Sequence, residues 1–173
     1  ESLDQGIKPV ISNTLLLAQD KSLASYITGA YENNAMAKTK SRDAIADNIL
    51  VMQTADEYIK NIHIIPIDSE WVISTATLTT SKTNSFSSQL KEAEPSMYID
   101  SGIYWGGTHD LIDEKLKQNR DDYGMFCSSR IGNGEKAGVV VVDIDKEAIT
   151  NLLEELNPGA GSIVSFVSPE GRE

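Results

Sequence analysis

Gly138-Val139-Val140-Val141-Val142-Asp143-Ile144-Asp145 is an almost uninterrupted run of β-branched residues, and it predicts a strand over 138–144. Asp143 is the only charged residue inside that predicted strand. Asp145 follows it as a favoured N-cap, so a helix is predicted over 146–156. A further strand is predicted over 162–167.

Strands are also predicted upstream of this run. One spans 123–131, and Gly132-Asn133-Gly134 after it is a strong hairpin signal, because Asn and Gly adopt the backbone angles of tight turns. Two apolar, β-branched runs over 62–67 and 71–78 predict another hairpin. Pro66 lies in the first of these runs and has no backbone N–H to donate, so we expect that strand at an edge of the sheet.

The segment between the two hairpins is irregular. Ser and Thr dominate its first part and predict a surface loop over 79–88, followed by a short helical piece over 87–93. The least regular stretch spans 95–122 and contains a short predicted helix over 109–118. We call the whole stretch from 87 to 122 the insert.

Helical periodicity governs the first third of the chain. Apolar residues recur at steps of three and four from 4 to 31 and predict one long amphipathic helix, with Pro9 tolerated in its first turns. Polar residues around Asn33-Asn34 interrupt the pattern, and a second helix is predicted over 41–60. Because the strands are joined mostly by short turns, the expected fold class is α+β, with one antiparallel sheet flanked by helices.

Length and charge restrict the functional classes. At 173 residues the chain is long enough for one well-cored domain. Its formal net charge is −11 and it has no block of Lys or Arg, so we expect no nucleic-acid partner. Cys127 is the single cysteine and cannot form an internal disulfide. No Cys/His spacing resembles a zinc site, so neither a metal nor a cofactor is expected.

The two ends suggest a piece of a longer protein. The chain starts at Glu1 without an initiator Met or signal peptide, and it stops in a turn-like sequence over 168–173. Its longest purely aliphatic run, 139–142, is far shorter than the roughly 20 apolar residues of a membrane helix. We expect a membrane segment or an artificial boundary just beyond each end.

The closing part of the chain resembles the closing half of Cache domains. In that family a strand similar to 138–144 leads into a helix, a glycine turn and a last strand, as 159–171 follows here. The upstream order of a long helix, a second helix, the 62–67 run and a strand containing Ser74 is similar too. A general likeness in the order of elements extends over the whole chain, whereas the close likeness in sequence covers about the last third.

This resemblance implies the extracytoplasmic sensor domain of a bacterial receptor in the inner or cytoplasmic membrane. A methyl-accepting chemotaxis protein is the first choice of parent and a sensor histidine kinase the second. Residues 1–60 would form the stalk and sheet-packing helices and residues 61–173 the PAS-like Cache domain, in a single structural unit. The ligand would be a small polar molecule such as an amino acid, amine or carboxylate. No covalent chemistry is needed, so we expect no enzyme.

Six residues are predicted to bind this ligand between the sheet and the insert: Asp143, Tyr104, Trp105, Arg130, Tyr123 and Tyr98. Asp143 can accept hydrogen bonds from a ligand ammonium, or instead share the start of the following helix with Asp145. Tyr104 and Trp105 can form an aromatic wall, or simply fill the core. Arg130 is the candidate partner of a carboxylate, or a solvated arginine at a hairpin end.

The two histidines, His63 and His109, are interpreted without a catalytic role. His63 lies in an apolar strand, which is typical of a core or edge histidine. His109 has Ser and Thr nearby but no nucleophile elbow or triad spacing. A secreted hydrolase would need a solvent-open Ser or Cys within hydrogen-bond reach of either ring.

The long first helix raises a second functional class. Its apolar stripe can pack wholly on the sheet, or its first half can pair with a second copy of the chain. We expect weak homodimerisation through this helix. The alternative function is a ligand-free interaction or dimerisation domain at the cell surface, which a collapsed and aromatic-filled pocket would favour.

Overall fold

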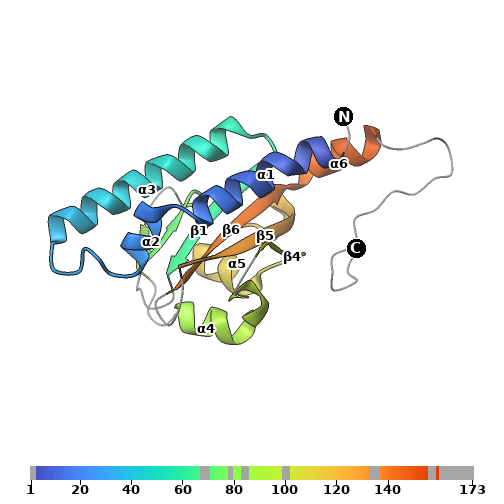
Figure 1. Ribbon diagram of the computed structural model, residues 1–173. Coiled ribbons are helices and arrows are strands. Elements are labelled where there is room, and N and C mark those ends of the chain that lie inside the picture. The colour runs from blue at the N-terminus through green and yellow to red at the C-terminus, as the bar shows by residue number, and fades with distance from the viewer. Residues whose placement is uncertain are drawn as a thin grey trace.

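The fold is a six-stranded antiparallel sheet between two helical layers (Figure 1). The computed structural model describes residues 3–66, 71–77, 80–82, 86–98, 102–132, 137–155 and 159. Within these residues the strand order is β3-β2-β1-β6-β5-β4. The predicted α+β class is confirmed, and the architecture is compatible with a PAS-like fold.

Three long strands form the centre of the sheet: β1 (Ile59–Pro66), β5 (Tyr123–Ile131) and β6 (Gly138–Asp145). The strands predicted from the valine run and from residues 123–131 are therefore confirmed. The expected edge position of the first strand is wrong, because β1 pairs with both β2 and β6. Pro66 is tolerated because it is the last residue of β1, beyond the residues that pair with β2.

The outer strands are short. They are β2 (Trp71–Ser74), β3 (Thr80–Lys82) and β4 (Tyr104–Gly106). β2 ends before the predicted limit of 78, while β3 falls in the predicted loop and β4 in the irregular insert. β3 and β4 have three residues each, which is too short for an alternating pattern to predict a strand. They form because the longer strands β2 and β5 offer them backbone hydrogen-bond partners.

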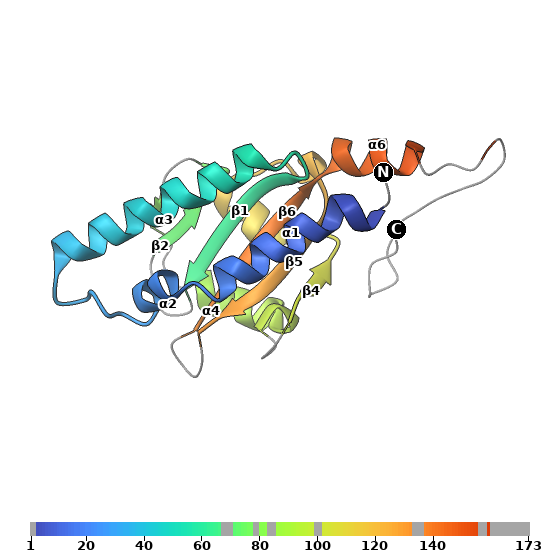
Figure 2. The same ribbon diagram turned by 45° about the horizontal axis from the view of Figure 1, so that its top comes forward.

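One face of the sheet is covered by α1 (Leu3–Ala18), α2 (Lys21–Ile27) and α3 (Ala35–Ala55), as Figure 2 shows. We call it the helical face. The single predicted helix over 4–31 is wrong, because Asp20 is extended and its side chain accepts a hydrogen bond from Leu23 N at 2.8 Å. The first helix therefore stops before Asp20, and Asp20 caps the second helix, α2.

The second predicted helix, 41–60, exists with different limits. Asn34 caps α3 through a 3.0 Å bond from Ala37 N, so the helix begins before residue 41. It ends at Ala55, and the last predicted residues belong to β1 instead. Asn34 was part of the predicted break, and the same polar side chain that interrupts the apolar pattern starts the helix.

The insert covers the other face of the sheet, which we call the insert face (Figure 1). Besides β4, which joins the sheet, its described elements are α4 (Phe86–Ala93), the 3-10 turn η1 (Pro95–Tyr98), α5 (Asp110–Leu116) and the 3-10 turn η2 (Arg120–Asp122). The helices predicted over 87–93 and 109–118 are thus confirmed, with α5 shorter than expected.

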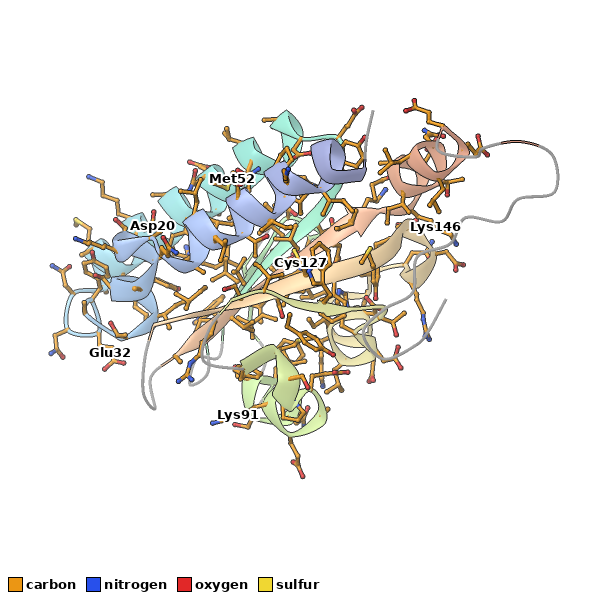
Figure 3. All side chains as sticks on the ribbon, turned by 45° about the vertical axis from the view of Figure 1, so that its right-hand side comes forward. Asp20, Glu32, Met52, Lys91, Cys127 and Lys146 are labelled. Atoms are coloured by element: carbon orange, nitrogen blue, oxygen red, sulfur yellow. The ribbon has the colours of Figure 1, made fainter. Side chains whose placement is uncertain are left out.

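β6 is buried on both faces. Val140, Val142 and Ile144 belong to the core on the helical face, while Val139 and Val141 belong to the core on the insert face. Figure 3 shows Cys127 in the interior, where its sulfur lies 3.3 Å from Thr14 Oγ1 of α1. Burial raises the pKa of the Cys127 thiol to about 12.

The helix after β6 also follows the prediction. α6 (Lys146–Glu155) is capped by Asp145, whose carboxylate accepts from Ala148 N at 3.0 Å. The strand predicted over 162–167 lies outside the described residues, as do Asn133 and Gly134 of the hairpin signal. Among the described helices, none combines the length and apolar character needed to cross a membrane.

Candidate functional site

Asp143 is a carboxylate placed in the core by the alternation of β6. Val139 and Val141 pack on the insert face, so Asp143, two residues on, points to the same side. Its side chain has 0% exposure. An isolated carboxylate is costly to remove from water, so this position requires compensating donors.

Two buried histidines supply the main donors. His63 of β1 places Nε2 2.9 Å from Asp143 Oδ2, and His109 places Nε2 2.5 Å from Oδ1. His63 comes from the neighbouring strand, on the same face of the sheet. His109 is the N-cap residue of α5 in the insert. Both side chains have 0% exposure, and their rings meet edge to face. Asp143 thus joins the sheet to the insert.

The outer nitrogen of His63 is also engaged. Its Nδ1 lies 2.8 Å from Ser74 Oγ, and that oxygen accepts a hydrogen bond from Ala76 N at 3.1 Å. The Ser74 hydroxyl proton is then directed to Nδ1, which leaves Nε2 to donate to Asp143. Ser74 is 4% exposed, so this Ser-His-Asp chain does not contain the solvent-open hydroxyl that a hydrolase requires.

His109 lies between two carboxylates. Its Nδ1 is 3.1 Å from Asp113 Oδ1, and the Tyr123 hydroxyl donates to Asp113 Oδ2 at 2.7 Å while its ring stacks on the imidazole. Burial alone would lower the pKa of His109, but the charges and hydrogen bonds of Asp143 and Asp113 raise it to about 10. Burial raises the pKa of the Tyr123 hydroxyl.

Two amides complete the surroundings of Asp143. Gln118 Nε2 donates to Oδ2 at 2.5 Å, and Asn61 Nδ2 lies 3.5 Å from the same oxygen. Burial would raise the pKa of Asp143, yet the neighbouring His63 and His109 hold it well below its usual range. Gln118 Oε1 is buried and has no hydrogen-bond partner among the described residues.

The structure brings five of the six predicted ligand residues to the insert face. Asp143 and Tyr123 belong to the histidine network, whereas Tyr104 and Arg130 line a separate cavity of about 70 Å³. Tyr98 is buried in the same core, where burial raises the pKa of its hydroxyl. Trp105 is not brought together with them, because strand alternation turns it to the helical face.

Sequence reasoning missed His63 and His109 as partners of Asp143. They lie 80 and 34 residues away along the chain, so no local spacing connects them. One signal was present, because a carboxylate inside an apolar strand must find buried donors and the chain has only two histidines.

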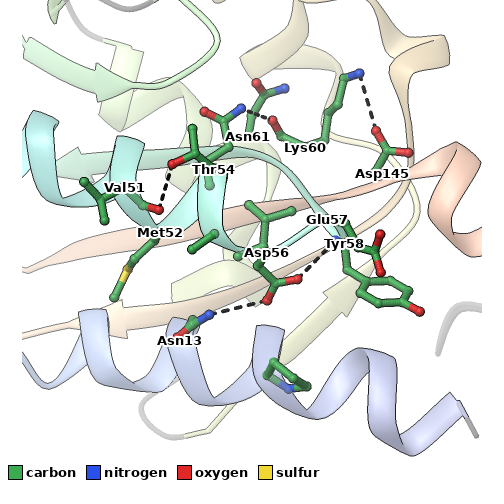
Figure 4. A pocket seen from close by; sticks show the side chains of 14 residues that line it. Asn13, Val51, Met52, Thr54, Asp56, Glu57, Tyr58, Lys60, Asn61 and Asp145 are labelled. Atoms are coloured by element: carbon green, nitrogen blue, oxygen red, sulfur yellow. Dashed lines mark hydrogen bonds and ion pairs between the residues drawn. The ribbon is translucent and has the colours of Figure 1, made fainter. Parts of the chain in front are cut away.

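An open groove of about 1070 Å³ lies where α1 approaches the end of α3 and the start of β1 (Figure 4). Asp56 is held at its side by Asn13 at 3.5 Å and by Tyr58 N at 3.1 Å. Asn61 lines the groove and also contacts Asp143, so one residue belongs to both the groove wall and the buried network.

Comparisons with known proteins return no relative for this chain. No family model matches it, and neither a curated protein nor a solved structure matches. The functional proposal below rests on the geometry of the buried network and on the resemblance described above.

Proposed function

We propose that this chain is the ligand-receiving, extracytoplasmic sensor domain of a membrane-anchored bacterial receptor of the Cache type. A chemoreceptor is the preferred parent, and a sensor histidine kinase is the second choice. The observation that carries the proposal is Asp143, a fully buried carboxylate held between a histidine of the sheet and a histidine of the insert.

A buried network of charged side chains stabilises a core no better than apolar side chains of similar volume. Well-packed apolar side chains in place of a buried ion pair are often neutral or more stable by about 1–4 kcal/mol. Buried charges with shifted pKa values are instead typical of functional sites. Asp143 lies between the sheet and the insert, which is where the resemblance to Cache domains puts the ligand.

The network also suggests how binding is transmitted. His63 and Asn61 reach Asp143 from the sheet, whereas His109 and Gln118 reach it from the insert. A ligand that replaces the hydrogen bond from His109 or from Gln118 to Asp143 would favour a different position of the insert on the sheet. Binding then shifts the balance between two arrangements without any covalent step.

The proposed ligand is small and polar: an amino acid, an amine or a carboxylate. The cavity beside Tyr104, Ser128 and Arg130 measures about 70 Å³, so anything larger than a few heavy atoms requires the insert to move. Arg130 offers a guanidinium for a carboxylate, and Asp143 offers a carboxylate for an ammonium.

A thermal-shift screen of the purified chain tests this function. A ligand present at 100 times its Kd should stabilise the fold by about 2.7 kcal/mol and raise Tm by roughly 5–10 °C. Asp143→Asn should lose the shift, whereas the exposed Asp121→Asn makes the same chemical change away from the network and should keep it. A shift of full size in Asp143→Asn would refute binding at this site.

A second candidate function is a ligand-free dimerisation domain. The insert face is largely filled by aromatic and aliphatic side chains, including Phe86 and Phe126. Among the described residues, large exposed apolar side chains occur only on α1 and α3: Leu16 at 61%, Met36 at 82%, Leu50 at 37% and Val51 at 64%. A second copy of the chain packed on these helices would cover them.

Sedimentation equilibrium distinguishes this alternative. We expect weak, concentration-dependent dimers that disappear in Leu16→Lys, because α1 carries the proposed contact. Met36→Lys, at the start of α3, shows whether the contact extends to that helix. A tight dimer together with an empty ligand screen would favour the second function, and a strict monomer would remove it.

A further inference from the structure

We infer that His63, His109 and Asp143 form a binding site for a divalent transition-metal cation of the Zn²⁺ class. The inference gives the site at Asp143 a ligand class, and its role in signalling rests on the proposed sensor function. Metal binding itself is a separate property that can be measured on the isolated chain.

The donor set is suited to such a cation. One atom each from His63, His109 and Asp143 lie within 4.8 Å of one another. Two imidazole nitrogens and one carboxylate oxygen are a ligand combination that Zn²⁺ takes in proteins, with a further position left for water or another group. All three side chains are fully buried, so their attraction to a cation would be weakly screened by solvent.

The three ligands come from well-ordered elements. His63 belongs to β1 and Asp143 to the central strand β6, and His109 is fixed by the start of α5. A site built on strands and a helix end keeps its donor atoms in place before the cation arrives. His63 and Asp143 are far apart in the sequence, and they meet because β1 and β6 are neighbours in the sheet.

The outer nitrogens provide an independent observation. Both histidines turn Nε2 to the centre of the cluster and Nδ1 to an oxygen. The partner of His63 is Ser74 Oγ, whereas His109 Nδ1 lies 3.2 Å from the Tyr123 hydroxyl oxygen and forms an ion pair with Asp113 Oδ1 at 3.1 Å. Metal-binding histidines almost always have such a partner, which fixes the ring and its tautomer. The Tyr123 hydroxyl in turn holds Asp113, so His109 is supported through two further residues.

The distances define what must change on binding. The nitrogen–oxygen separations of 2.9 and 2.5 Å are those of hydrogen bonds. A tetrahedral Zn²⁺ with bonds of about 2.0–2.1 Å would separate its ligand atoms by roughly 3.3 Å. Each histidine nitrogen must therefore move away from the Asp143 oxygen that it contacts by less than about 1 Å. His109 must release its Nε2 proton to the solvent, whereas the ring proton of His63 must move from Nε2 to Nδ1, where Ser74 Oγ accepts it.

An open groove and a further donor are close by. Asn61 lines the open groove of Figure 4 and contacts Asp143 at 3.5 Å, so this residue touches both the groove and the cluster. Gln118 brings a buried amide to the same carboxylate. Its oxygen has no partner among the described residues, and a turned amide would present that oxygen to a cation.

The test is a titration of the untagged, metal-stripped chain with Zn²⁺ against a chromophoric chelator. We expect one equivalent to bind, with affinity at least 100-fold weaker in His63→Gln, His109→Gln and Asp143→Asn. Asp113→Asn should weaken binding about 10–100-fold, since it removes only the support of His109. Exposed Asp121→Asn should bind as the wild type does.

Two outcomes would overturn the inference. One is a wild-type chain that binds Zn²⁺ no more tightly than Asp143→Asn, and the other is unchanged binding in a folded His109→Gln. Where a variant does not fold, the Co²⁺ spectrum of the wild type decides. Intense visible bands of a four-coordinate site without sulfur charge transfer support the site, whereas the weak spectrum of hydrated Co²⁺ excludes it.

Failure of this inference is distinct from failure of the sensor proposal. An organic ligand that shifts the Tm of metal-free protein, with no Zn²⁺ bound, would remove the metal site and leave the sensor. One equivalent of Zn²⁺ bound at the cluster, with no shift from any amino acid, amine or carboxylate, would keep the metal site and remove the proposed organic ligand.

Discussion

The two faces of β6 are built on different chemical principles although they belong to one strand. Towards α1 and α3, Val140, Val142 and Ile144 belong to an apolar core. Towards the insert, the same alternation ends in Asp143, which requires His63 and His109 to be buried at all. Burial alone therefore does not indicate function in this strand, because both faces are buried. The indication of function is a buried charge that needs hydrogen-bond donors from other residues.

The largest expected effect comes from moving a carboxylate to the helical face. Val142→Asp would bury a charge opposite Ile62 and Cys127, with no histidine on that face among the described residues. We expect a loss of about 4 kcal/mol or more, enough to prevent stable folding. Urea denaturation followed by circular dichroism measures it. A folded variant within 1 kcal/mol of wild type would show that the faces do not differ.

The next effect separates stability from function on the insert face. His63→Leu leaves Asp143 short of a donor and should cost about 3–5 kcal/mol in the free energy of unfolding. Replacing His63, His109 and Asp143 together by Leu removes the charge as well, so most of that loss should be recovered. The triple variant should bind neither Zn²⁺ nor an organic ligand. If it is as unstable as the single variant, the network is needed for folding.

A smaller effect is expected from a substitution in β4 that disturbs packing on the insert face. A Cβ on Gly106 would lie 2.3 Å from the Phe126 ring, whereas one on Gly107 would meet nothing within 4 Å. Gly106→Ala should therefore cost about 1–3 kcal/mol, and Gly107→Ala less than about 0.5 kcal/mol. Thermal unfolding of the matched pair measures the difference, and equal Tm values would mean that β4 moves freely relative to Phe126.

The smallest effect concerns the break in the helical layer. Asp20 accepts from Leu23 N at the start of α2, so Asp20→Ala should cost about 1 kcal/mol. Asp20→Asn keeps the acceptor oxygen and should cost much less. Chemical denaturation compares the two. A gain in stability in Asp20→Ala would instead support the single continuous helix that the apolar periodicity predicts.

Prediction from sequence succeeded where a local pattern was long. The valine run of β6, the β5 strand and α6 with its Asp145 cap each have eight to ten residues of consistent signal. Asp143 was also identified, since a charge in an apolar strand is visible without a structure.

Prediction failed where neighbours in space decide. Pro66 indicates an edge strand by its chemistry, yet it sits at the end of a central strand because β2 stops pairing before it. The three residues of β4 form a strand only because β5 lies beside them. Trp105 and Tyr104 are adjacent in sequence and were assigned to one site, but consecutive residues of a strand point to opposite faces.

By itself the sequence determined the fold class, the strands β5 and β6 and the carboxylate of Asp143 inside an apolar strand, because periodicity and charge are properties of neighbouring residues. Only the tertiary structure decided what surrounds that carboxylate. The antiparallel pairing of β1 with β6 sets His63 beside Asp143, and packing of the insert adds His109 from the other side. Contacts of this kind follow from strand order and layer packing, which no spacing along the chain encodes.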